Sequence, residues 1–188
     1  MIKIGITGSM SSGKTTASRF LSFNRGPLFS ADKVVKNLYA NRKIKKIIAY
    51  KLDFKLSPQF KKDLKEAIVS KKENLNKLEK IIHPLVRKQM LFFLKKNTNK
   101  RFLFCEIPLL VESKLTKYFD KVIFVKSSKS LRLKRYKLMG GNEKLFNFLD
   151  RKQIKVSRKA KFCDHVIVNN KSLTILKKNL LNIIQKYV

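Results

Sequence analysis

The stretch that decides the fold is GITGSMSSGKTTASRF, residues 5–20. Residues 8–15 within it read GSMSSGKT and satisfy the pattern G-x-x-x-x-G-K-[ST], although only six glycines serve all 188 residues of the chain. The β-rich segment 1–7 precedes this loop, and the amphipathic segment 14–23 follows it. A strand, a glycine loop and a helix in this order are the context in which the pattern binds phosphate, so chance is a poor explanation.

This loop predicts a binding site for a nucleoside triphosphate. Successive backbone N–H groups and the helix N-terminus would surround the β-phosphate. Lys14 would bridge the β- and γ-phosphate oxygens, and the Thr15 hydroxyl would ligate Mg²⁺. An ordinary glycine turn is the alternative interpretation. The predicted nucleotide-binding residues of the loop are Gly8, Ser11, Ser12, Gly13, Lys14, Thr15 and Thr16.

Continuous apolar runs predict the other strands. They cover residues 27–31, 101–108, 121–127 and 164–170. Because helical segments separate these runs, they predict an α/β fold with a central five-stranded parallel sheet covered by helices on both faces. A closing helix follows at 172–188, with Ser172 placed to cap its N-terminus.

Between residues 42 and 98 the strand signal disappears. The pattern there indicates several helices, one ending at residue 82 and another beginning at Pro84. Such a block is a natural place for an inserted acceptor-binding domain, and a later polar, helical stretch is a candidate lid. The predicted organisation is a nucleotide-binding core at 1–35 and 99–188, with a lid at about 128–160, and a helical acceptor-binding insertion at 36–98.

The formal net charge of +33 has two interpretations. Clustered lysine and arginine residues are typical of nucleic-acid binders, because they release counterions from phosphate backbones. Here the basic residues are spread along the whole chain and lysine outnumbers arginine, which favours a compositional bias compatible with small anionic substrates. We therefore expect no nucleic-acid partner.

Other compositional features predict a cytoplasmic protein without a membrane partner. The chain has no run of eighteen apolar residues, and its N-terminus does not read as a signal peptide. Cys105 and Cys163 lie in apolar segments without metal or redox spacing, so we expect reduced thiols. The expected assembly is a monomer or a weak homo-oligomer.

Asp32 is the first candidate outside the loop. It follows the second predicted strand, at the edge of the sheet where open α/β folds bind ligands. A carboxylate there could orient an attacking hydroxyl group or accept its proton. The alternative is a helix N-cap, which aspartate also favours. No N-K-x-D motif for guanine follows a strand, so small-molecule kinases remain as the candidate class.

The order of the motifs resembles the dephospho-CoA kinase family of P-loop kinases over nearly the whole chain. None of the motifs after the glycine loop is specific for this family by itself, but the order in which they occur is. The matching elements are TGSMSSGKT (7–15), SAD (30–32), His83-Pro84, PLLVE (108–112), Arg135, Gln153 and CDHVIVN (163–169). The resemblance implies ATP-dependent phosphorylation of the ribose 3′-hydroxyl of dephospho-CoA, the final step of coenzyme A synthesis, with ATP and Mg²⁺.

The resemblance also implies an acceptor site. Asp32 matches the position proposed as catalytic base, together with Lys14 as a catalytic residue of the loop. His83, Pro84 and Arg87 match the helical segment that borders the CoA site. Read alone, a His-Pro pair is equally a helix boundary, and that alternative stays open.

The loop after the third predicted strand is similar to the family's acceptor loop. Leu109, Leu110 and Glu112 match positions near the acceptor. Glu106, at the end of that strand, resembles an acid that holds a magnesium-bound water, which makes Thr15 and Glu106 the predicted metal residues. A surface glutamate in a salt bridge is the alternative for Glu106.

Phosphoryl transfer also needs positive charge close to the moving group. Arg135 matches the lid position of the family and is the predicted catalytic arginine, whereas Arg132, Arg151 and Arg158 are further candidates. Asn169 matches a position near adenine, with a turn-forming asparagine as the alternative.

The chain departs from the family pattern at several positions. Ser9 and Ser11 replace loop glycines, and a positive φ angle at either would cost about 1 kcal/mol. Ser30 replaces the first acid of a DAD motif, and Lys137 or Met139 stands where a second lid arginine is usual. We therefore expect slower turnover or weaker nucleotide binding.

Two rival functions remain. A nucleoside monophosphate kinase is the nearest, although the arginine pattern of its acceptor site is missing after the second strand. A basic nucleic-acid-dependent ATPase is the other, and it would show polynucleotide-stimulated hydrolysis with a steep salt dependence of binding. No aromatic cluster for base stacking supports it.

Overall fold

The structure, a computed structural model, describes residues 1–188 apart from the side chain of Lys72. The described residues form two compact units, one of Met1–Ser30 with Leu94–Val188 and the other of Ala31–Phe93. The helical unit thus begins and ends a few residues before the predicted limits of 36 and 98. As a consequence Asp32 belongs to the helical unit and not to the unit that carries the P-loop.

Within the described residues, the first unit contains a five-stranded parallel sheet with the strand order β2-β3-β1-β4-β5. This confirms the predicted sheet. The strands are β1 (Ile2–Gly8), β2 (Leu28–Ser30), β3 (Phe102–Glu106), β4 (Lys121–Lys126) and β5 (His165–Val168). They are as long as or shorter than the apolar runs, since proline and turn residues at the ends cannot continue a ladder. Gly8, where β1 ends, lies beside Val125 of β4.

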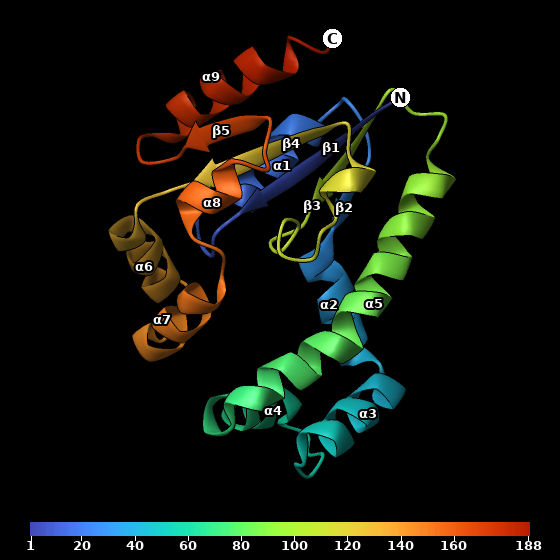
Figure 1. The fold of residues 1–188 in the computed structure, drawn as a ribbon, viewed down its shortest axis with the longest axis vertical. Helices are drawn as coiled ribbons and strands as arrows, with labels where there is room; N and C mark the ends of the chain where they lie inside the picture. Colours follow the sequence, from blue (N-terminus) through green and yellow to red (C-terminus); the bar gives the residue numbers. More distant parts are fainter. The chain divides into compact units, whose positions relative to one another are not determined.

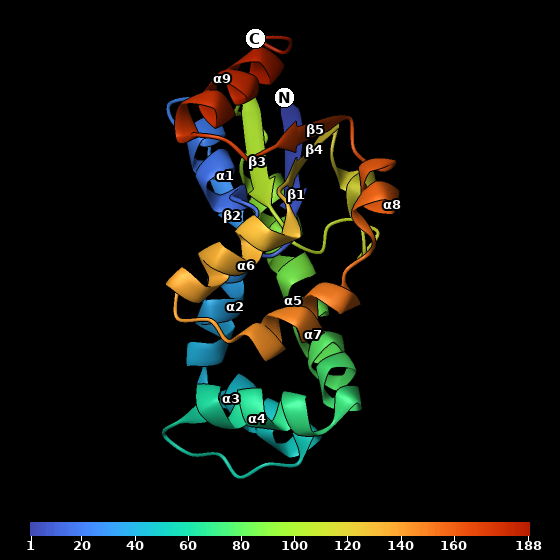
Figure 2. The same cartoon turned by 90° about the vertical axis from the view of Figure 1, so that its left-hand side faces the viewer.

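Helices cover both faces of this sheet. Helices α1 (Lys14–Ser22) and α9 (Leu173–Ile184) lie on one face and the short helix α8 (Val156–Ala160) on the other (Figure 2). Alternate strand residues point toward α1 and α9, as the two-residue period of a strand requires. The buried core between them contains Ile4, Ile6, Ala17, Leu21, Phe102, Phe104, Ile123, Val125, Ile167, Leu176, Leu180 and Ile184. Ser172 caps α9 as predicted, because its hydroxyl accepts a hydrogen bond from the Ile175 N–H.

The predicted lid consists of α6 (Lys129–Leu138) and α7 (Glu143–Lys152), followed by α8 (Figure 1). Ser128 and Asn142 cap the first two helices with side-chain oxygens. A partly buried ion pair joins these helices, with 2.6 Å between Arg132 Nη1 and Asp150 Oδ1. The lid segment is therefore two capped helices held together by charge and packing.

A 3₁₀ helix (Thr116–Tyr118) lies in the loop between β3 and β4.

The second unit is helical. It contains α2 (Ala31–Ala40), α3 (Arg42–Leu52), α4 (Phe60–Ser70) and most of α5 (Lys72–Lys96). Its core is made by Ile48, Leu52, Phe60, Leu64, Leu78 and Ile82, with apolar side chains of α2 packed against it. Among the helices of the described residues, none offers the unbroken apolar length that a bilayer crossing requires.

The prediction of a helix that begins at Pro84 is wrong. Helix α5 continues through Pro84 without a break. Proline removes one backbone hydrogen bond and crowds the preceding turn, which normally ends a helix. Here Leu78 and Ile82 before the proline and Val86 after it all pack against the same core, so burial of one apolar stripe outweighs the local preference.

Candidate active site

The P-loop connects β1 to α1 through backbone that only glycine fits at two positions. Gly13 has φ +97°, and a Cβ atom there would lie 2.3 Å from Nδ2 of Asn169. A Cβ atom on Gly8 would lie 2.4 Å from the carbonyl oxygen of Val125. Both distances are too short for a real carbon atom, so the loop runs tight against β4 and the segment after β5.

The two serines that replace family glycines differ in conformation. Ser11 has φ +56°, whereas Ser9 is not among the described residues with a positive φ angle. Only Ser11 therefore carries the strain of about 1 kcal/mol that a left-handed residue costs. The carbonyl group of Ser9 accepts hydrogen bonds from the Ser12 N–H at 3.2 Å and from Nζ of Lys14 at 3.2 Å, which closes the loop.

The loop also presents a buried polar group that suits a phosphate. Among the described residues Ser12 Oγ has no hydrogen-bond partner, although Ser12 is fully buried. A buried hydroxyl without a partner is costly, so such groups are uncommon in folded proteins. Lys14 is itself buried, with its ammonium group held at the loop. A bound phosphate oxygen would satisfy the Ser12 hydroxyl, and the residues present therefore fit a nucleotide.

The predicted metal residues lie together. Glu106 is 1 % exposed at the end of β3, and its carboxylate accepts hydrogen bonds from Thr15 Oγ1 at 2.6 Å and Ser18 Oγ at 3.2 Å. This burial excludes the alternative of a surface glutamate. Within the described residues no group of three or more His, Cys, Asp or Glu side chains forms a cage for a metal. Mg²⁺ needs none, because it commonly takes one or two protein ligands with phosphates and waters.

The predicted catalytic arginine contacts the segments after β4 and β5. Arg135 donates to Ser127 Oγ at 3.2 Å and to the carbonyl oxygen of Asn169 at 3.1 Å. Arg132 is committed to Asp150, and its guanidinium also lies over the ring of Phe146. Arg132 is therefore a structural residue that joins α6 to α7.

Asn169 braces the P-loop. Its Nδ2 group donates to the carbonyl oxygen of Ser12 at 2.9 Å, and the residue is buried. The same nitrogen occupies the space that a side chain at position 13 would need. A role of Asn169 near adenine stays a prediction. Its contact with the P-loop is a structural role beyond the formation of a turn. A continuous path of hydrogen bonds therefore runs from the lid segment to the P-loop. It passes through Arg135, Ser127, Asn169 and Ser12.

The loop after β3 holds the predicted acceptor residues. Leu110 is fully buried and its side chain packs beside Gly5 of β1, which fixes the loop to the sheet. Leu109 is partly exposed. Both carboxylate oxygens of Glu112 lie 3.0 Å from Nζ of Lys159, a buried residue of α8 that the sequence reasoning missed. Lys159 stands in a polar, lysine-rich helical segment, so the sequence pattern does not predict that it is buried.

The remaining predicted residues belong to the helical unit. Asp32 is the second residue of α2, two positions past the N-cap position of that helix, and is exposed. His83 and Arg87 are one helical turn apart on α5, so they lie on the same face, with Pro84 between them. Neither the acceptor role of these residues nor a catalytic role for Asp32 is tested by their positions, and both stay predictions.

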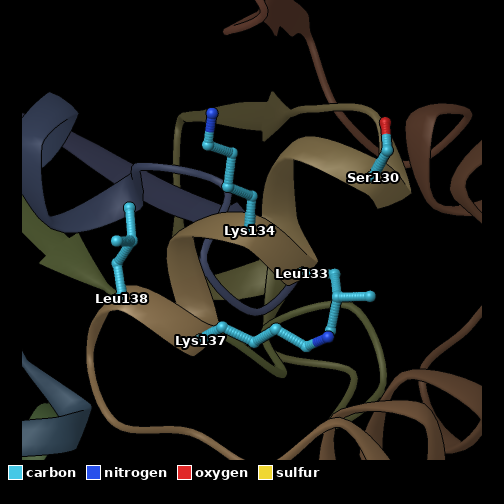
Figure 3. A pocket seen from close by; sticks show the side chains of 5 residues that line it. All are labelled: Ser130, Leu133, Lys134, Lys137 and Leu138. Atoms are coloured by element: carbon cyan, nitrogen blue, oxygen red, sulfur yellow. The ribbon is translucent and has the colours of Figure 1, made fainter.

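A shallow cavity lies on α6 (Figure 3). Its volume is about 470 Å³. The residues that line it are Ser130, Leu133, Lys134, Lys137 and Leu138, which share one side of the helix. None of the predicted site residues of the described chain lines it, so it is a surface feature of the lid and separate from the P-loop.

The parallel sheet with its P-loop, the buried acid at the end of β3 and the basic helices after β4 define a P-loop kinase. Comparisons with known proteins agree. The family model described as dephospho-CoA kinase matches residues 2–174, and the chain belongs to this family. It is therefore a kinase.

Individual relatives show how far the similarity reaches. A dephospho-CoA kinase of Rickettsia typhi is 32 % identical over 190 residues, with 98 % of this chain and 97 % of the relative covered. One of Bartonella henselae is 30 % identical, with 97 % and 96 % covered. The solved structure of dephospho-CoA kinase from Campylobacter jejuni is 29 % identical, with 98 % and 96 % covered and a TM-score of 0.67. TT1252 from Thermus thermophilus is 25 % identical, with 100 % and 98 % covered and a TM-score of 0.79.

Proposed function

We propose that this chain transfers the terminal phosphoryl group of ATP to the ribose 3′-hydroxyl of dephospho-CoA and so makes coenzyme A. The observation that carries the proposal is the P-loop, whose unpartnered Ser12 hydroxyl and buried Lys14 stand ready for phosphate in a chain of the dephospho-CoA kinase family. The names of the relatives support the choice of acceptor.

The donor side follows from the residues of the first unit. Backbone N–H groups of the P-loop and the Lys14 ammonium bind the β- and γ-phosphates, because α1 begins at this loop and presents its unpaired N–H groups. The Thr15 hydroxyl, and Glu106 through a water, would hold Mg²⁺. When bound, the ion neutralises phosphate charge.

The acceptor side rests on the helical unit. Asp32 orients the 3′-hydroxyl and accepts its proton, while His83, Pro84 and Arg87 contact the nucleotide part of the acceptor. Leu109 and the loop that Glu112 anchors are the acceptor residues of the first unit. Asp32 is exposed on the first turn of α2.

The chemistry is one in-line displacement. The 3′-oxygen forms a bond to the γ-phosphorus as the bond from that phosphorus to the β,γ-bridging oxygen breaks, and the electron pair leaves with ADP. The hydroxyl proton goes to Asp32. Arg135 brings positive charge to the transferring group, since positioning and charge do most of the work in phosphoryl transfer.

A coupled ADP-release assay with purified protein tests the proposal. We expect ADP release that depends on dephospho-CoA, with little turnover when adenosine monophosphate replaces it. Asp32→Asn should lower kcat by about 10²-fold, the range for loss of a general base. Lack of dephospho-CoA-dependent turnover, or full turnover in Asp32→Asn, would overturn the corresponding part. Polynucleotide-stimulated hydrolysis would instead support the basic ATPase.

The proposal includes the cytoplasm as the place of action. Cys105 and Cys163 are both free in the described residues, as expected for a reducing compartment. Mass spectrometry of alkylated protein taken directly from cells would find both thiols reduced, and a disulfide between them would contradict this part.

A further inference from the structure

The most unusual charged residue of the first unit is Lys159. It lies on α8, at the end of the predicted lid segment, and is only 1 % exposed. Fully buried lysines are rare because removing an ammonium group from water is costly. The resemblance to the family and the proposed reaction give this residue no role.

The ammonium group of Lys159 makes all its hydrogen bonds to the loop after β3. Nζ donates to the carbonyl oxygen of Pro108 at 2.8 Å and lies 3.0 Å from each carboxylate oxygen of Glu112. An ammonium group has three donors, and here the acceptors all belong to the segment that follows β3. Burial lowers the pKa of Lys159, and the nearby Glu112 carboxylate acts against that shift.

The loop after β3 connects Glu106, the predicted metal residue, with the start of the P-loop. Pro108 comes two residues after Glu106, whose carboxylate accepts a hydrogen bond from Thr15. The carbonyl oxygen of Pro108 also accepts from Thr7 Oγ1 at 2.9 Å, and Thr7 directly precedes the first glycine of the P-loop. The loop therefore lies at the carboxyl edge of the sheet, where ligands of open α/β folds bind.

From these contacts we infer that Lys159 is a positioning residue, which ties the end of the lid segment to the loop after β3 and holds that loop at the geometry needed for phosphoryl transfer. Lys159 does not touch the reacting groups. It acts through Pro108 and Glu112, whose positions depend on the buried ammonium group. The inference deepens the proposed function and rests on it for the reaction by which it is read out.

A double substitution separates this role from a contribution to stability. Lys159→Met alone leaves the Glu112 carboxylate without its buried cation, and should unfold at a lower temperature. Lys159→Met combined with Glu112→Leu leaves no charge unpaired, and Thr7 still satisfies the Pro108 carbonyl group. Replacement of both partners of a buried pair by apolar residues is often neutral for stability, so this double variant should regain most of the lost thermal stability.

Activity should not return with stability. We expect the double variant to keep a kcat for dephospho-CoA phosphorylation at least about ten-fold below that of the unaltered chain, as a loop displaced by a fraction of an ångström would produce. Its KM for ATP should change less than its kcat. Lys161→Met, which alters an exposed lysine two residues away, is the matched control and should retain kcat. A double variant with restored stability and unaltered kcat would overturn the inference.

Hydrogen–deuterium exchange gives a readout that needs no activity. The N–H groups of Ser113, Lys114 and Leu115 donate within the loop that Lys159 holds. Their exchange should be at least about ten-fold faster in the double variant, with β1 and α1 unchanged. Unaltered exchange there would overturn the inference. If the unaltered chain showed no turnover with dephospho-CoA, the proposed function would fail, and the exchange result alone would decide the role of Lys159.

Discussion

Replacement of Gly13 by alanine tests how the P-loop is built. The φ angle of +97° at Gly13 places an alanine in a strained conformation, at a cost of about 1–2 kcal/mol. The new Cβ atom would lie 2.3 Å from Asn169 Nδ2, so that side chain must move away from its 2.9 Å hydrogen bond to the Ser12 carbonyl oxygen. Loss of that bond costs about 0.5–1.5 kcal/mol more.

Gly140 is the matched control. It also has a positive φ angle, +78°, but a Cβ atom there would meet nothing within 4 Å. Gly140→Ala therefore carries the backbone strain without the clash, and both substitutions gain the same small benefit from a less flexible unfolded chain. We expect Gly13→Ala to lower the free energy of unfolding by about 1 kcal/mol more than Gly140→Ala does.

Urea unfolding of the two variants, each also made in an Asn169→Ala background, measures the difference. Without the Asn169 side chain, the cost of Gly13→Ala should fall to that of Gly140→Ala, because only the strain remains. Equal costs for the two glycines in the unaltered background would refute the reasoning. So would a cost of Gly13→Ala that does not respond to loss of the Asn169 amide.

Other expected outcomes concern the lid, α5 and a thiol. Arg135→Met should lower kcat by about 10²-fold with a smaller change in the KM for dephospho-CoA, and steady-state kinetics with Arg135→Lys should show partial recovery; unaltered kcat in either variant would count against the arginine. Pro84→Ala should raise the free energy of unfolding by about 1–3 kcal/mol in urea titrations, since it restores a helical hydrogen bond inside α5, and a loss of stability would be contrary evidence. Burial raises the pKa of the Cys163 thiol to about 11, so its alkylation rate should increase about ten-fold per pH unit from pH 8 to 10, whereas a plateau by pH 9 would be inconsistent with the buried site. The folded chain holds this proton more tightly than the unfolded one, so the stability from this group is complete below a pH of about 8.5 and is lost as the pH rises toward 11.

The sequence was sufficient for the sheet and for the donor half of the site. Apolar runs next to turn residues predict all strands of the first unit, and the P-loop pattern places its residues at the end of β1. These features are local, so a short window of sequence contains the information. Thr15 follows from the loop pattern and Glu106 from its resemblance to a magnesium-holding acid at the end of a strand, and the two side chains lie in hydrogen-bond contact.

Features that depend on distant packing were not predictable. Pro84 has the local properties of a helix start, yet residues on both sides of it join one core and α5 continues. Lys159 looks like any other lysine of a basic chain, and only the fold brings Glu112 and the Pro108 carbonyl oxygen to it. The family resemblance predicts a position near adenine for Asn169, whereas its contact with the P-loop depends on how β5 pairs with β4.

The structure distinguishes the two loop serines that stand where the family pattern has glycine. Of Ser9 and Ser11, only Ser11 has a positive φ angle, so the expected strain applies once. Ser9 contributes its carbonyl oxygen to the closure of the loop, a role that any residue can fill. Ser11 alone therefore carries a conformational cost from these two substitutions, and weaker nucleotide binding or slower turnover stays a prediction.

A single-turnover experiment with ATP labelled at the γ-phosphate tests the central claim most directly. With dephospho-CoA present, the label should be recovered in coenzyme A at the ribose 3′-position, and Asp32→Asn should slow its appearance by about 10²-fold. Label found only in inorganic phosphate, or transferred at the same rate without the Asp32 carboxylate, would contradict the account.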